Sequence, residues 1–279
     1  MSLIQTLVFA LIQGVTELFP ISSVGHAVLL PWVLHWPSLN KSATFLPYLV
    51  MLHVGTAVAL IIFFIKDWLT FLVSVFSPKK GNPKKVKIAR KEFELLIVGT
   101  LPAVVIGGLG ADSLAKLFAT PRVAMSFLIV NGVILIVGDR LLKRTGNKEI
   151  ADLTYGQTIV VGIMESLALI PGFSRSAMTM IGSLYYGLRY ESAARFSFLL
   201  ATPVIVGAAV LELPKMHHAG SMLTMGIIGG VVAGVAAYLS TWFLMRYFKR
   251  HEIKALRPFG IYCVAIGVIA WVISFFIGG

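Results

Sequence analysis

Two short polar segments interrupt long apolar stretches of the chain, and they contain the side chains best suited to chemistry. The first runs from Gln13 to His26, and the second runs from Glu165 to Ser176. An ionisable side chain inside a bilayer costs ~2.5–3.5 kcal/mol on insertion scales and usually serves a function. Each segment also contains a Pro close to Gly or Ser, residues that interrupt membrane helices. The sequence therefore predicts an intramembrane site built from two broken helices.

The first segment places an amide, a carboxylate, two hydroxyls and an imidazole in close succession. Gln13 and Glu17 are four residues apart, so they share one helix face. Ser22 and Ser23 follow the break as N-cap candidates, and His26 lies within one helical turn of both. A Ser or His can attack phosphorus, and a neighbouring His or Glu can transfer the proton. These residue types therefore indicate phosphoryl chemistry.

The second segment adds groups that bind anions. Pro171 and Gly172 break the chain, and Ser174, Arg175 and Ser176 open the following helix. A helix N-terminus offers free N–H groups and a positive dipole end, which suit phosphate. A guanidinium group can bind phosphate through two parallel hydrogen bonds. Because the sequence has no P-loop or soluble phosphatase motif, we expect the substrate to be a lipid phosphate presented by the membrane.

Several of these residues also have structural explanations. The serines of both segments can act as helix caps alone, and Glu17 and Arg175 can form an ion pair that joins the two segments. His26 can be a hydrogen-bonded core residue. We expect His53, an isolated polar residue in an apolar segment, to support packing or a neighbouring site residue. For Glu165, structural and site roles are both open.

The composition is that of a polytopic membrane protein. The 279 residues are 57% hydrophobic and only 13% charged, with a mean hydropathy of +0.87. Soluble domains contain about 25% charged residues. The single cysteine, Cys263, excludes an internal disulfide and a Cys-based zinc site. No Lys or Arg precedes the first apolar run, so a secretory signal peptide is not expected.

Six apolar segments are long enough to cross a bilayer, which requires about 20 residues. They are 46–65, 93–111, 121–141, 193–213, 221–245 and 258–277. Two further stretches, 3–36 and 156–187, are interrupted near their middles by the polar segments. Each half of these stretches is too short to cross alone. We therefore predict that both are re-entrant helix-loop-helix pairs.

The net charge of +12 reflects topology and not nucleic-acid binding, because the basic residues lie in short loops. Nineteen of the 24 Lys and Arg residues fall on one predicted side of the membrane. Most of them lie in the segments 77–91, 140–155, 188–195 and 246–257. This asymmetry requires both interrupted stretches to re-enter the membrane instead of crossing it. The first pair then enters from the outer face and the second from the cytoplasmic face.

The expected fold is an all-α integral membrane protein with six transmembrane helices and two re-entrant pairs. It forms a single polytopic domain over residues 1–279, made of inverted-topology repeats at about 1–145 and 150–279. Inverted repeats with broken helices that meet near the bilayer midplane are typical of secondary transporters. The architecture alone therefore does not separate transport from catalysis.

The motifs closely resemble signatures of the undecaprenyl-diphosphate phosphatase family, whose members are associated with bacitracin resistance. The motifs are Gln13-x-x-x-Glu17, Pro20-x-Ser22-Ser23-x-Gly25-His26 and Pro171-Gly172-Phe173-Ser174-Arg175-Ser176. The resemblance extends to chain length and to the order of re-entrant pairs and spans. It implies hydrolysis of the C55 isoprenyl diphosphate to the monophosphate carrier of peptidoglycan synthesis. It also implies a multi-pass protein of the bacterial inner membrane, a site that opens to the outer side, and a need for Mg²⁺ or Ca²⁺.

The resemblance also implies roles for individual residues. Ser23 and His26 are the nucleophile and acid–base candidates, in an order that the sequence leaves open. Glu17 is expected to be catalytic and, together with Gln13, to support a metal ion or proton transfer. Arg175 is expected to bind the diphosphate and to act in catalysis. The expected substrate contacts are Ser22, Ser174, Arg175 and Ser176.

Four positions depart from the family pattern. Gln13 occupies a position often held by Glu, which removes one charged metal ligand. Val24 stands where Thr is common, and Ala177 stands where Gly usually ends the second motif. Cys263 takes a place where Arg is common. The departures leave Ser23, His26 and Arg175 in place, although those in the motifs can alter cation dependence or rate.

The rival interpretation is a transporter or flippase of a phosphorylated lipid or anion that uses the same midplane site. A carrier needs Arg175 and the helix termini but no nucleophile, so replacement of Ser23 separates the two classes. The expected partners are an isoprenyl diphosphate and membrane lipids, with no nucleic acid. A homodimer is compatible with this architecture.

Overall fold

The computed structural model describes residues 2–34, 36, 45–78, 82–118, 120–141, 146–216, 221–250 and 254–277. In these residues the regular structure is helical, apart from one isolated bridge between Lys148 and Leu188. The prediction of an all-α protein is therefore confirmed. Parts of the basic loops, at 79–81, 142–145 and 251–253, lie outside the described residues.

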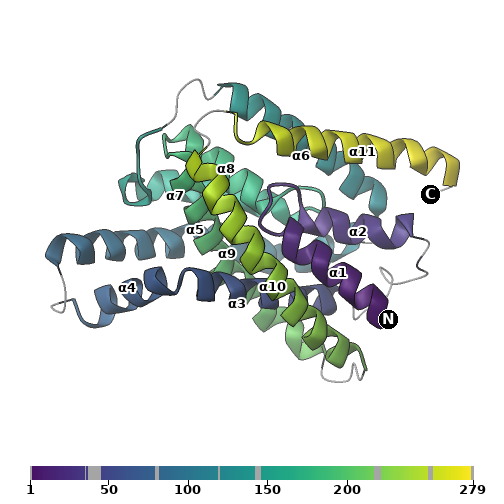
Figure 1. The fold of residues 1–279 in the computed structure, drawn as a ribbon, viewed down its shortest axis with the longest axis horizontal. Helices are drawn as coiled ribbons and strands as arrows, with labels where there is room; N and C mark the ends of the chain where they lie inside the picture. Colours follow the sequence, from purple (N-terminus) through teal and green to yellow (C-terminus); the bar gives the residue numbers. More distant parts are fainter. Residues whose placement is uncertain are drawn as a thin grey trace.

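The α-helices vary widely in length, and short 3-10 turns join some of them (Figure 1). The helices are α1 (Leu3–Thr16), α2 (Ser23–Val33), α3 (Phe45–Phe63), α4 (Ile65–Phe76), α5 (Pro83–Phe118), α6 (Pro121–Leu141), α7 (Tyr155–Ser166), α8 (Arg175–Tyr185), α9 (Tyr190–Glu212), α10 (Ser221–Arg250) and α11 (Arg257–Ile277). The 3-10 turns are Ile150–Asp152, Leu167–Leu169 and Leu213–Met216.

Five helices in the described part of the chain are long and apolar enough to cross a membrane, namely α5, α6, α9, α10 and α11. The pair α3 and α4 supplies a sixth if it counts as one broken span, because the two helices meet at a bend of 75°. The protein is therefore a multi-pass membrane protein. The basic segment predicted as a loop is largely helical, since α5 already begins at Pro83, a residue favoured at the first helical position.

Four shorter helices form the two interrupted stretches. Helix α1 starts at a capping box between Ser2 and Gln5, and α7 starts at a capping box between Thr154 and Gln157. Both end inside the polar segments, and α2 and α8 continue beyond the breaks. Their lengths of 14, 11, 12 and 11 residues are below the ~20 needed to cross a bilayer.

Small residues bring the long helices into close contact. A Cβ atom on Gly55 of α3 would lie 1.9 Å from the Gly230 carbonyl oxygen of α10. A Cβ atom on Gly132 of α6 would lie 2.5 Å from the Gly260 oxygen of α11. Backbone approach through small residues is the usual way in which membrane helices pack. These contacts hold the framework around the four short helices.

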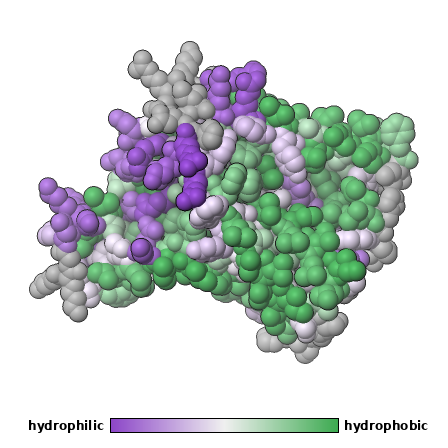
Figure 2. All heavy atoms as spheres, viewed as in Figure 1, coloured by the Kyte–Doolittle hydropathy of each residue, from purple (hydrophilic) through white to green (hydrophobic). Residues whose placement is uncertain are grey.

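Polar and apolar surfaces are separated along the long axis of the molecule. On the face seen in Figure 2, hydrophilic residues gather at one end and hydrophobic residues cover most of the rest. Arg195 of α9 forms ion pairs with Asp67 of α4 at 2.5 Å and with Glu92 of α5 at 2.8 Å. Both chain termini lie toward the other end (Figure 1).

Candidate active site

The two chain breaks meet inside the helical framework. A Cβ atom on Gly25 would lie 3.2 Å from the Cα atom of Gly172, so the two loops touch at backbone level. The Ser176 hydroxyl donates to the Phe19 carbonyl oxygen at 3.1 Å. Residues separated by about half of the chain therefore share one site.

Each break ends in a capped helix N-terminus. The Ser22 hydroxyl accepts from the Gly25 N–H at 3.1 Å, and the Ser174 hydroxyl accepts from the Ala177 N–H at 3.3 Å. Ser22 has a φ of 66°, an uncommon conformation for a residue with a side chain. Such strain occurs mostly at functional sites. The first N–H groups of α2 and α8 have no partner within their helices, which leaves two positive ends near one another.

Asn131 of α6 connects the two breaks. Its amide nitrogen donates to the Pro20 carbonyl oxygen at 3.3 Å, and its oxygen accepts from the Ser174 N–H at 3.0 Å. The same amide nitrogen lies 3.5 Å from the Cys263 sulfur of α11. Asn131 is completely buried. A single side chain from a spanning helix thus fixes the distance between the two loops.

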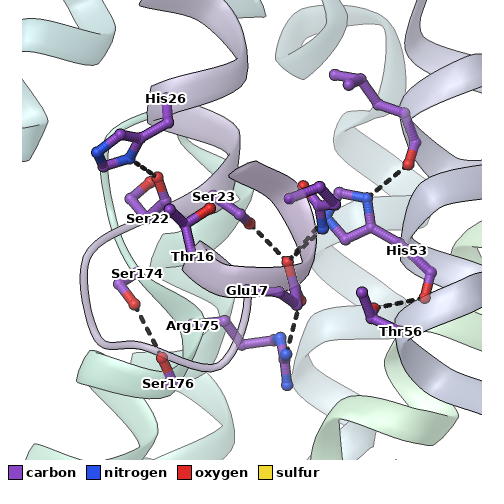
Figure 3. Close-up of polar contacts among 12 residues, drawn as sticks. Thr16, Glu17, Ser22, Ser23, His26, His53, Thr56, Ser174, Arg175 and Ser176 are labelled. Atoms are coloured by element: carbon purple, nitrogen blue, oxygen red, sulfur yellow. Dashed lines mark hydrogen bonds and ion pairs between the residues drawn. The ribbon is translucent and has the colours of Figure 1, made fainter. Parts of the chain in front are cut away.

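Glu17 is the centre of the polar cluster (Figure 3). Its Oε1 accepts from the Arg175 guanidinium at 2.8 Å. Its Oε2 accepts from the Ser23 hydroxyl at 2.5 Å and from the Gln13 amide at 2.8 Å. Glu17, Ser23 and Gln13 are each less than a tenth exposed. A carboxylate that accepts the proton of a serine hydroxyl has the geometry of a base beside its nucleophile.

His53 of α3 completes this cluster. Its Nε2 lies 3.2 Å from Glu17 Oε2, and its Nδ1 lies 2.8 Å from the Leu49 carbonyl oxygen. Both ring nitrogens therefore face oxygen acceptors, which is the arrangement of a charged imidazolium. The Thr56 hydroxyl bonds the His53 carbonyl oxygen at 2.7 Å. The sequence predicted that His53 supports packing or a neighbouring site residue, and these contacts connect it to Glu17.

Arg175 lies between two buried carboxylates. One of its terminal nitrogens contacts Glu17, and the other lies 3.9 Å from Glu165 and 3.4 Å from the Ser197 carbonyl oxygen. Neither carboxylate oxygen of Glu165 has a hydrogen-bond partner among the described residues. Glu165 is therefore a second buried acidic side chain close to Arg175, and the sequence left open whether it has a structural or a site role.

His26 lies at the edge of the cluster, and its ring is directed away from Glu17 and Ser23 (Figure 3). Its Nδ1 lies 2.7 Å from the Ser22 carbonyl oxygen, and its Nε2 lies 2.9 Å from the Tyr262 hydroxyl of α11. Unlike most of the cluster, the imidazole is partly exposed. In this conformation Glu17, and not His26, contacts the Ser23 hydroxyl.

Gln13 and Glu17 offer oxygen ligands of the kind that a divalent cation takes. The Oε1 atom of Gln13 is buried and has no hydrogen-bond partner among the described residues, and the Glu17 carboxylate lies beside that amide. Within the same residues, no group of three or more His, Cys, Asp or Glu side chains could hold a metal ion. Mg²⁺ is commonly bound by one or two protein oxygens together with substrate phosphates.

The structure brings together the predicted residues Gln13, Glu17, Ser23 and Arg175. The predicted serines Ser22, Ser174 and Ser176 lie at the adjoining helix starts. Sequence reasoning missed Asn131 and Tyr262. The signal for Asn131 was its position as the one Asn in an apolar span, whereas Tyr262 gave no signal because tyrosine is common in membrane helices.

The fold and the site define the class of protein: a multi-pass helical membrane protein with a buried Ser–Glu–Arg centre at the meeting point of two broken helices. The chain belongs to the family of bacitracin resistance protein BacA, whose model matches residues 6–269.

Similar proteins cover nearly the whole chain. Undecaprenyl-diphosphatase 2 of Chromobacterium violaceum is 48% identical over 272 residues, which are 96% of this chain and 98% of that protein. The undecaprenyl-diphosphatase of Acidiphilium cryptum is 47% identical over 95% of each chain. That of Gluconacetobacter diazotrophicus is 46% identical over 100% of this chain and 98% of its own.

Proposed function

We propose that this protein hydrolyses undecaprenyl diphosphate to undecaprenyl phosphate and inorganic phosphate, which returns the lipid carrier to cell-wall synthesis. The family and the names of its relatives support this activity. The observation that carries the chemistry is the Ser23 hydroxyl, which donates at 2.5 Å to a carboxylate already paired with Arg175. Transport of an anion does not require a serine held against a base.

In the first half of the reaction, Ser23 attacks the terminal phosphorus of the diphosphate. A bond forms between Ser23 Oγ and phosphorus while the Ser23 proton passes to Glu17. The bond from phosphorus to the bridging oxygen breaks, and its electron pair leaves with undecaprenyl phosphate. Arg175 and the N–H groups at the starts of α2 and α8 stabilise the charge on the phosphoryl oxygens.

In the second half, water releases the phosphate. The water oxygen bonds to phosphorus, and one water proton passes to Nε2 of His26. The bond between phosphorus and Ser23 Oγ breaks, and Glu17 returns its proton to that oxygen. Serine and carboxylate are then restored, and His26 loses its proton to solvent at the partly exposed edge of the site.

Substrate binding changes the partner of Arg175 in this proposal. The guanidinium bonds Glu17 in the described conformation, and a diphosphate offers it a stronger bidentate acceptor. Release of Arg175 frees Oε1 of Glu17, while Oε2 still accepts from the Ser23 hydroxyl. Glu165, 3.9 Å from the other terminal nitrogen, gives Arg175 a second acidic neighbour.

The proposed cation is Mg²⁺ or Ca²⁺, held by the oxygens of Gln13 and Glu17 together with the diphosphate. When bound, it neutralises phosphate charge and so favours attack by an oxygen nucleophile. Removal of the ion with a chelator is expected to abolish phosphate release, and return of the ion is expected to restore it.

We propose that the chain forms six spans and two re-entrant pairs in an inverted repeat in the bacterial inner membrane. Packing that recurs between the halves supports this arrangement. Helix α1 packs on α10, and α7 packs on α5 in the same way. A Cβ atom on Gly14 would lie 2.3 Å from the Ala233 oxygen of α10, and one on Gly162 would lie 2.2 Å from the Gly99 oxygen of α5. The distribution of basic residues supports a cytoplasmic polar end. The site is proposed to open to the outer side, as the family resemblance implies.

Phosphate release by the purified protein tests the activity. The wild type is expected to release phosphate from C55 or C15 isoprenyl diphosphate, and Ser23→Ala is expected to lose at least ~100-fold in kcat. Ser77→Ala, in the segment between α4 and α5, is the control and should match the wild type. Full activity of Ser23→Ala would contradict the mechanism. Folded wild type without activity would favour a carrier, for which Ser23→Ala is silent.

A further inference from the structure

Helix α11 reaches the first chain break through two adjacent residues. The Tyr262 hydroxyl lies 2.9 Å from Nε2 of His26, and the Cys263 sulfur lies 3.9 Å from the Pro20 carbonyl oxygen. The predicted site residues all lie in the two polar segments, whereas α11, like His53 of α3 and Asn131 of α6, contributes from outside both motifs. Tyr262 is 39% exposed, whereas Cys263 is completely buried.

The hydrogen bonds of His26 determine which of its nitrogens carries the proton. The Ser22 carbonyl oxygen can only accept, so Nδ1 of His26 must donate to it across 2.7 Å. In the neutral ring, Nε2 then carries the lone pair and accepts the proton of the Tyr262 hydroxyl. Nε2 is also the atom that takes a proton from water in the proposed mechanism, so the Tyr262 O–H rotates away from its lone pair at that step and the Tyr262 oxygen then accepts from the new Nε2–H.

Tyr262 also fixes the plane of the imidazole. The rings of His26 and Tyr262 are stacked, with centroids 5.7 Å apart and planes 11° apart. The same tyrosine therefore contacts both one ring face and the Nε2 atom of His26. A partly exposed imidazole without these contacts would be free to sample other rotamers.

We propose that Tyr262 is a positioning residue of this phosphatase, which acts through His26. Its hydroxyl holds Nε2 in place before the proton transfer and accepts from Nε2–H after it, and its ring holds the imidazole plane. The inference rests on the proposed function, in which His26 is an acid–base group. It adds α11 to the elements that build the site.

A double-mutant comparison tests the proposal by phosphate release from isoprenyl diphosphate. Tyr262→Phe keeps the stacked ring and removes the hydroxyl, so we expect kcat to fall roughly 3- to 10-fold. KM should stay within about twofold, because no substrate contact is lost. In a His26→Asn background, Tyr262→Phe should cause no further loss, since its effect passes through His26. Tyr238→Phe on α10, whose ring packs on Phe63, is the matched control and should match the wild type.

The outcomes separate this inference from the proposed function. Wild-type kcat in Tyr262→Phe, together with a strong loss in His26→Asn, would overturn the role of Tyr262 and leave the phosphatase mechanism intact. An equal loss from Tyr262→Phe in both backgrounds would also overturn it, because the tyrosine would then act independently of His26. Full activity of His26→Asn would instead overturn the assignment of His26 on which the inference rests.

Discussion

Glu17 receives donors from four separate parts of the chain: Gln13 of α1, Ser23 at the start of α2, His53 of α3 and Arg175 of α8. Two of these donors carry positive charge, which compensates the cost of burying a carboxylate. The other two donors, the Gln13 amide and the Ser23 hydroxyl, orient the carboxylate. At the scale of single residues, the site is therefore built around the buried Glu17 carboxylate. Its neighbours stabilise the charge and leave Oε2 in hydrogen-bond contact with the Ser23 hydroxyl.

Replacement of Glu17 by Gln tests this arrangement with almost no change in shape. We expect at least a ~100-fold loss of kcat, because the amide cannot accept the Ser23 proton. We also expect a loss of ~3 kcal/mol in the free energy of unfolding, because Arg175 and His53 lose their common anion. Phosphate release and thermal unfolding in detergent measure the two effects. Glu94→Gln, which alters a carboxylate bonded to Tyr155, is the control.

A second prediction concerns the cation. Gln13→Glu places a second carboxylate beside Glu17, and divalent cations bind more tightly as the ligand charge increases. The free Mg²⁺ concentration that gives half-maximal activity should therefore fall. A titration of the rate against free Mg²⁺ gives this midpoint concentration. Gln5→Glu, on the first turn of α1, is the control. An unchanged midpoint in Gln13→Glu would remove Gln13 from the cation site.

At the scale of elements, the site exists because two pairs of short helices stop inside the framework and are held together by longer ones. The polar segments themselves predicted the breaks, since Pro, Gly and Ser within apolar stretches have a local physical effect. The connections between the breaks were not predictable in this way. Asn131 lies 111 residues from Pro20, and Tyr262 lies 236 residues from His26. Nothing local in either residue indicates its partner.

Asn131→Leu tests the connection between the breaks. The variant keeps a side chain of similar size but leaves the Pro20 carbonyl oxygen and the Ser174 N–H without this partner. A buried polar group without a partner costs ~1–3 kcal/mol, so thermal stability should fall. Activity should fall further than stability alone explains, because the two loops lose their common anchor. Ser126→Ala on the same helix, which removes a bond from Trp271, should lower stability without a comparable loss of kcat.

At the scale of the whole molecule, composition and charge were sufficient to predict a polytopic helical protein. Hydropathy located the long helices because a bilayer imposes a minimum length on each span. It did not reveal the 75° bend between α3 and α4, since a bend leaves the apolar pattern unchanged. The basic segment was predicted as a loop because of its charge, but charged residues also form the exposed first turns of α5.

The proposed topology predicts which ends of the spans are accessible from each side. A cysteine at Lys84, at the start of α5, should react with a membrane-impermeant maleimide only after the cytoplasmic side is opened. A cysteine at Thr120, between α5 and α6, should react in intact spheroplasts. The native Cys263 is completely buried, and its replacement by Ala removes any background. The reverse pattern of labelling would contradict the orientation, and equal labelling of both positions would contradict a spanning α5.

The most direct test of the central claim is to trap the reacting residue. The protein would be mixed with isoprenyl diphosphate labelled with ³²P in the terminal phosphate, quenched during turnover and digested. We predict acid-stable label on the peptide that contains Ser23, as expected for phosphoserine, and no label in Ser23→Ala. Acid-labile label on the peptide of His26 in place of Ser23, or turnover of Ser23→Ala at the wild-type rate, would contradict attack by Ser23.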